Sequence, residues 1–99
     1  MLIVAGTITI DPAQVDRFSE AATQMMLATH EEPGNIAYVF SVNVADPGSI
    51  EIFEVWEAAQ DLDRHMTLPH MTTFRAALKE LTVTGRSISR YEVASHEPM

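Results

Sequence analysis

The chain has 99 residues, 46% of them hydrophobic, and its six basic and fourteen acidic residues give a net charge of -8. This length predicts one domain over residues 1–99, and the negative field excludes nucleic acid and anionic membrane surfaces as favoured partners. The lack of cysteine excludes disulfides and thiolate chemistry. Because we find neither a basic, cleavable leader nor a long apolar run, we expect a cytoplasmic protein.

The first third of the chain predicts a strand followed by a helix. LIVAGTITI (2–10) is rich in β-branched residues, which favour a strand. Asp11 then stands where a helix cap is expected, with a proline after it and Gln14 three residues on, which predicts a capping box. Apolar residues at helical spacing predict an amphipathic helix over about 12–31, ended by the proline and glycine at 33–34.

The rest of the chain predicts a hairpin, a helical region broken by a proline, and a last strand. Asp-Pro-Gly chemistry marks the hairpin turn, and Pro69 forces a new helix to begin. The expected elements are strands over 36–42 and 50–56, a short helix over about 58–66, a helix over 69–81 and a strand over about 82–93, followed by a polar tail over 94–99.

This order, β-α-β-β-α-β, predicts an α+β fold of the ferredoxin-like, split βαβ type. The second strand is apolar on both faces, with Ala37 and Val39 on one side and Ile36, Tyr38, Phe40 and Val42 on the other. Helices can cover only one face of a four-stranded sheet. A second subunit is therefore expected on the other face, and a symmetric homodimer is the simplest arrangement.

The segment FEVWEAAQDLDRHMTLPHM (53–71) carries the candidate chemistry. Trp56 and Glu54 share a face of the third strand, His65 lies on the buried stripe of the short helix, and His70 lies in the first turn of the next helix. These residues can surround one cleft. His65 is either a hydrogen-bonded packing residue or a general base, and Glu54 is either paired with an arginine or tuned for proton transfer.

No cofactor is predicted. His70 is either structural or a partner for a developing negative charge. A metal site made by both histidines and a carboxylate is conceivable, but their spacing matches no standard ligand pair, so no metal is expected. The sequence contains no phosphate-cradling glycine loop and no dinucleotide fingerprint.

Two stretches resemble a known family. EVWEAAQDLDRHMTLPHMTTF (54–74) is similar to the signature of the antibiotic biosynthesis monooxygenase (ABM) family, in particular its small quinol monooxygenase branch, and EEPGNIAYVF (31–40) resembles the family's turn and aromatic second strand. The resemblance implies a dimeric α+β barrel with one apolar cleft in each subunit. It also implies oxidation of a phenolic or quinol-type aromatic by molecular oxygen, with neither a metal nor an organic cofactor.

On this reading His65 removes a proton from the substrate, and His70 or an arginine holds the resulting anion. Trp56 and Tyr38 orient the aromatic ring. The predicted catalytic residues are His65, His70 and Glu54, and the predicted substrate-binding residues are Trp56, Tyr38, Phe40, Met66, Phe74 and Arg75.

The resembled family also contains other activities. Its heme-degrading branch uses an asparagine in the first strand and an axial histidine in the last helix; here the first strand has no asparagine, and the helix has no histidine after His70. An isomerase of small phosphorylated sugars would need a cationic anchor, for which Arg64, Arg75 and Arg86 are the candidates. A non-catalytic, small-molecule-binding stress protein is the third possibility. A cleft rich in aromatic residues and methionines favours a flat aromatic molecule.

Overall fold

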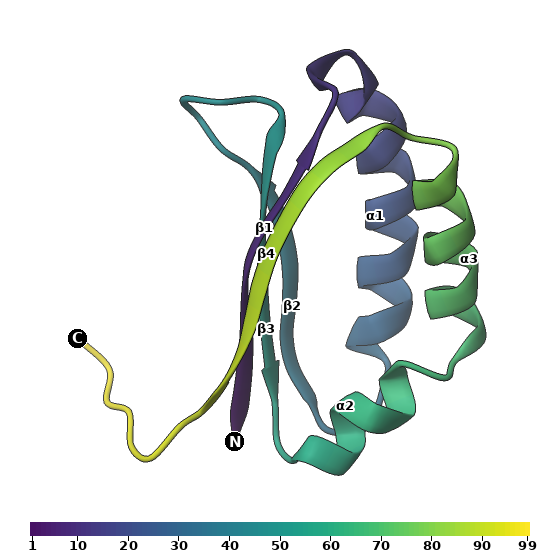
Figure 1. The fold of residues 1–99 in the computed structure, drawn as a ribbon. Coiled ribbons are helices and arrows are strands. Elements are labelled where there is room, and N and C mark those ends of the chain that lie inside the picture. The colour runs from purple at the N-terminus through teal and green to yellow at the C-terminus, as the bar shows by residue number, and fades with distance from the viewer.

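One antiparallel sheet, with its strands in the order β2-β3-β1-β4, organises the fold. The computed structural model describes residues 1–99, and the elements follow the predicted sequence order (Figure 1). They are β1 (Leu2–Ile10), η1 (Pro12–Gln14), α1 (Val15–His30), β2 (Asn35–Val42), β3 (Ser49–Trp56), α2 (Ala59–His65), α3 (Pro69–Lys79) and β4 (Val83–Glu92).

The helices lie on one side of the sheet. In Figure 1, α1 and α3 run side by side along one face, α2 crosses the end of the sheet where β3 stops, and no helix lies on the opposite face. This arrangement confirms the predicted ferredoxin-like α+β fold. None of the helices combines the length and the apolar composition needed to cross a lipid bilayer.

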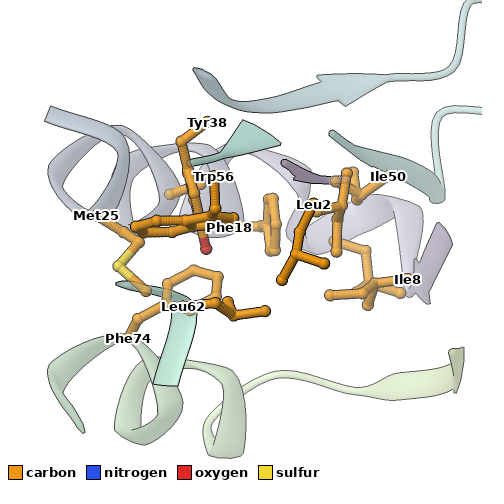
Figure 2. Packing of buried hydrophobic residues seen from close by; sticks show 12 residues of the cluster. Leu2, Ile8, Phe18, Met25, Tyr38, Ile50, Trp56, Leu62 and Phe74 are labelled. Atoms are coloured by element: carbon orange, nitrogen blue, oxygen red, sulfur yellow. The ribbon is translucent and has the colours of Figure 1, made fainter. Parts of the chain in front are cut away.

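The core fills the space between the sheet and the helices (Figure 2). Alternate side chains of β1 and β3 point inward, as the two-residue period of a strand requires. The predicted stripe of α1 is also correct, since Phe18, Ala22, Met25 and Thr29 are all buried. The cluster consists of Leu2, Ile8, Ile10, Phe18, Ala22, Met25, Tyr38, Ile50, Ile52, Trp56, Leu62 and Phe74.

The predicted capping box is wrong in its second half. The Asp11 carboxylate accepts a hydrogen bond from the backbone N–H of Ala13 at 2.9 Å, but it caps the short 3₁₀ turn η1 rather than α1. The Gln14 side chain does not reach back to Asp11. Its Oε1 instead accepts from the backbone N–H of Thr82 at 2.7 Å, so it fixes the chain just before β4.

The predicted inward face of β2 holds for Tyr38 and Phe40, which pack against the helix layer. It does not hold for Ile36, which is 51% exposed; Val42 is on the predicted side, where it lines a small pocket with Phe18 and Ile50, but it is 42% exposed. A register shift after Asn35 puts Ile36 out of step with the strand, as a β-bulge does. Val42 lies at the far end of the same edge strand.

The sheet face opposite the helices carries exposed apolar side chains. Val39, Phe53 and Tyr91 come from three strands and are 42%, 45% and 53% exposed. They alternate with the residues that enter the core, so they share this outer face. The protein therefore presents an apolar surface where its own helices offer no cover.

The turn from α1 to β2 is fixed against α2. Gly34 has a φ of +83°, a left-handed conformation that favours glycine. One Arg64 Nη2 atom donates to the carbonyl of Pro33 at 2.9 Å and to Asp61 Oδ1 at 2.7 Å. These two hydrogen bonds fix the turn, and they therefore hold Glu32, the residue before Pro33, in a defined position.

A non-glycine residue in the left-handed conformation costs roughly 1–2 kcal/mol. In a domain of this size each kcal/mol lowers the melting temperature by about 4–8 °C, so we expect Gly34→Ala to lower it by at least about 5 °C. The added Cβ would also overlap the Asp61 carboxyl group. Differential scanning calorimetry measures the change. Gly85→Ala is the matched control, because its Cβ would lie 3.8 Å from the Thr9 side chain. Equal melting temperatures for the two variants would contradict this account.

Candidate active site

A single buried carboxylate oxygen joins two histidines. The Nδ1–H of His65 and the Nε2–H of His70 both donate to Oε2 of Glu32, each at 2.6 Å. The side chains of His65 and Glu32 are only 1% and 4% exposed. We call Glu32, His65 and His70 the Glu32 centre; it joins the turn after α1, the end of α2 and the start of α3.

The Glu32 centre sets the protonation of His65. Burial lowers the pKa of His65, and the hydrogen bond and negative charge of Glu32 only partly oppose this effect. The ring is therefore neutral near pH 7, with its proton on the Nδ1 that faces Glu32. Its Nε2 makes no hydrogen bond within the protein, so it can accept a proton.

The same three residues form a possible ligand set for a metal. Two histidines and a glutamate bind zinc in many catalytic sites, and the three ligand atoms here lie within 4.8 Å of one another. Ligands of a tetrahedral zinc ion, with bonds of about 2.1 Å, lie roughly 3.4 Å apart. The two separations of 2.6 Å are hydrogen-bond distances, so the geometry fits proton sharing better than coordination.

A second buried acid lies on β3. Oε1 of Glu54 accepts a hydrogen bond from Trp56 Nε1–H at 2.9 Å, and Glu54 forms no ion pair. The predicted alternative, in which an arginine pairs with Glu54, is wrong. Burial raises the pKa of Glu54 to about 7, helped by the nearby charge of Glu32 and opposed by the Trp56 hydrogen bond.

A cleft of about 760 Å³ lies beside these acids, between the sheet and the helices α2 and α3. This volume is within the range of small-molecule sites. Thirteen of its twenty lining residues are hydrophobic. The predicted site residues that line it are His65, Glu54, Tyr38, Phe40, Met66, Phe74 and Arg75.

Two predicted site residues do not line this cleft. Trp56 is fully buried, with its ring centroid 5.0 Å from that of His65 and 6.4 Å from that of Tyr38. It is therefore not the cleft wall that the sequence predicted; it supports the lining residues from behind and donates to Glu54. His70 lines a separate groove between α1 and α3 and reaches Glu32 from that side.

Tyr38 offers a hydroxyl to the cleft. Burial raises the pKa of Tyr38, and the nearby charges of Glu54 and Glu32 raise it further. Its hydroxyl therefore stays protonated at neutral pH. A protonated hydroxyl in an apolar cleft can donate a hydrogen bond to a substrate oxyanion.

Comparison with known proteins gives the family. The family model for antibiotic biosynthesis monooxygenase matches residues 1–77. The chain belongs to the ABM family. This finding confirms the resemblance noted in the sequence, and the matched region contains the Glu32 centre, Glu54 and the signature segment 54–74.

Two solved structures agree in fold, and one further relative matches in sequence. A solved structure from Deinococcus radiodurans, described as a proposed antibiotic biosynthesis monooxygenase, is 28% identical, with a TM-score of 0.91 over 100% of this chain and 98% of that one. The structure of Rv0793 from Mycobacterium tuberculosis is 20% identical, with a TM-score of 0.86 over 98% of both chains, a likeness of fold alone. The uncharacterized protein sll1783 of Synechocystis is 26% identical over 98 residues, which are 99% of this chain and 67% of that protein.

Sequence reasoning missed Glu32 as a site residue. A signal for it was present, because the buried stripe Phe18, Ala22, Met25 and Thr29 of α1 continues to Glu32 with the same alternating steps of four and three. A glutamate that extends a buried helical stripe must find partners, since an unpaired buried charge is costly. That cost identifies it as a candidate for a polar site.

The raised pKa of Glu54 gives a stability prediction. Between its ordinary value of 4.5 and about 7 the folded state holds a proton that the unfolded state has lost, so stability falls as pH rises through this window. Glu54→Gln keeps an oxygen that accepts from Trp56 Nε1–H, but it cannot titrate, so the stability of the variant does not fall through this pH window. We expect the stability of the variant relative to wild type to increase by roughly 2–3 kcal/mol from pH 5 to pH 8. Urea denaturation of both proteins measures it, and a difference that does not change with pH would refute it.

Proposed function

We propose that this ABM protein is a cofactor-independent monooxygenase that oxidises a phenolic or quinol-type aromatic with molecular oxygen. One observation carries the proposal. The buried pair of Glu32 and His65 holds the imidazole neutral and leaves its Nε2 free, on a residue that lines an apolar cleft. Family membership supports the same class of reaction.

The pair supplies what such a reaction needs first, which is a base. Oxygen reacts slowly with a neutral phenol but accepts an electron readily from a phenolate. Nε2 of His65 takes the phenolic proton, and the Glu32 carboxylate stabilises the imidazolium that forms, as in other acid–histidine pairs. The hydroxyl of Tyr38 donates to the phenolate oxygen.

The cleft then controls the reaction with oxygen. Its apolar walls exclude water from the radical pair that forms when the phenolate gives one electron to oxygen. Recombination makes a carbon–oxygen bond. For a substrate with a reactive CH₂ group, one oxygen atom stays as a carbonyl and the other leaves as water with the two hydrogens, so the reaction needs no external reductant.

An isomerase of phosphorylated sugars is less well supported. Of its three candidate anchors, Arg75 and Arg86 line the cleft. Arg64 does not line it, because it donates to Pro33 and Asp61. The interior of the cleft offers Phe40, Ile52 and similar apolar side chains to a sugar rich in hydroxyls. Such groups would lose their hydrogen bonds to water without replacement.

Substitutions in the pair test the proposed base. We expect His65→Ala and Glu32→Gln each to lower kcat by at least about 10²-fold, the usual contribution of a general base and its support. His96→Ala, in the exposed tail, is the control. Oxygen uptake with 1,8-dihydroxyanthrone, in the presence of EDTA, measures kcat. In wild type, activity should fall on the acidic side, with a midpoint below the ordinary histidine pKa of 6.5, because burial lowers the pKa of His65.

Two outcomes would contradict this role of His65. Normal turnover per folded molecule, combined with a lower melting temperature, would make His65 a packing residue. An acidic limb near pH 7 that disappears in Glu54→Gln would move the base to Glu54, whose pKa is about 7.

We infer further that two copies pack through the open sheet face that carries Val39, Phe53 and Tyr91. Exposed apolar side chains on one face of a sheet are a common basis for association. In sedimentation experiments at micromolar concentration we expect twice the chain mass of 11.0 kDa. Phe53→Lys should give the monomer mass, because it buries a charge at the contact.

Val44→Lys is the matched control for this test. Val44 is fully exposed in the loop between β2 and β3, so the same added charge should leave the mass unchanged. A wild-type protein that sediments at the monomer mass would refute the dimer.

A further inference from the structure

The basic residues of this acidic chain gather at one place. The chain has six lysines and arginines in total against fourteen acids. Four of the six line the cleft, and Glu54 is the only acid that does so. We call these four residues, Arg75, Lys79, Arg86 and Arg90, the cationic rim.

The cationic rim is built from two elements that face each other across the cleft. Arg75 and Lys79 are one turn apart on α3, so they project from the same side of that helix. Arg86 and Arg90 are four residues apart on β4 and so lie on the same face. They pair in register with Ile8 and Val4 of β1, whose side chains point toward the helices. All four rim residues are exposed, which places their charges at the mouth of the cleft and the apolar side chains further in.

Acidic side chains of the protein neutralise little of the positive charge of the cationic rim. Arg90 lies 3.7 Å from Asp63, and both side chains are largely exposed, so this pair is weak. Arg75 donates to the carbonyl of Met66 at 2.9 Å. Lys79 and Arg86 form no ion pair. Like charges around one opening repel each other, and an anion between them removes that repulsion.

We propose that the cleft selects an amphipathic aromatic anion, with its ring among the apolar side chains and a carboxylate, sulfonate or phosphate at the cationic rim. The inference rests on the proposed function only in taking this cleft as the substrate site. The rim gives the orientation: the charged end stays near α3 and β4, and the ring enters toward Tyr38 and His65.

Binding of two matched dyes tests the selection. The probes are 8-anilinonaphthalene-1-sulfonate and N-phenyl-1-naphthylamine, which share an aromatic body and differ by one sulfonate. Fluorescence titration gives each Kd for wild type, Arg86→Gln and Arg17→Gln. Arg17 lines the separate groove between α1 and α3, so its substitution removes the same charge elsewhere.

We expect Arg86→Gln to weaken binding of the sulfonate about fivefold, the size of one exposed charge contact, and to change binding of the neutral dye by less than twofold. Arg17→Gln should leave both within twofold. Raising the salt concentration should weaken only the sulfonate. Equal effects of Arg86→Gln on both dyes, or equal effects of the two variants on the sulfonate, would overturn the proposal. The arginines of β4, an edge strand, would then serve mainly to discourage pairing with other strands.

A second measurement separates this inference from the proposed oxygenation. Binding of 1,4-dihydroxynaphthalene and of its 2-carboxylate is compared under nitrogen, and oxygen uptake is then measured with both. Preference for the carboxylate that Arg86→Gln reduces about fivefold supports the anion site, even if oxygen uptake is absent and the oxygenase proposal fails. Oxygen uptake with no preference between the two quinols overturns the anion site and leaves the oxygenase proposal standing.

Discussion

The arrangement of the helices depends on one buried carboxylate. Glu32 can remain buried only because two histidines, from α2 and α3, donate to it. The same two bonds fix the positions of both helices relative to the turn after α1. Oε1 of Glu32 is buried without a partner in the protein, so the site also keeps one acceptor for a further hydrogen bond. The same side chain therefore fixes both helices and keeps one oxygen available for a hydrogen bond.

The sequence predicted the fold well because the fold follows from periodicity. The two-residue alternation in β1 and β3 and the stripe of α1 each select one buried face, and together with the strand order they leave one arrangement. The same periodicity correctly placed His65 on the buried side of α2. Where local geometry overrides the period, as at the bulge near Ile36, the prediction was wrong.

The site was predicted only in part, for a physical reason. Periodicity says which face a residue is on, but it does not say how deep the residue lies or which distant side chain it meets. Trp56 was therefore placed on the correct face but at the cleft wall, whereas it lies behind it. The partners of Glu54 and His65 depend on contacts across two and thirty-three residues of sequence, respectively. Only the contact between Glu32 and His65 required knowledge of the complete fold.

The Glu32 centre and the cationic rim differ in how they are tied to the rest of the protein. The centre is buried where a turn and two helices meet, so a change there disturbs packing as well as chemistry. The rim residues are exposed on α3 and on an edge strand, where most substitutions change stability little. The two parts can therefore diverge at different rates. Descendants of one ancestral scaffold could exchange the rim residues while they inherit the buried Glu32 centre unchanged.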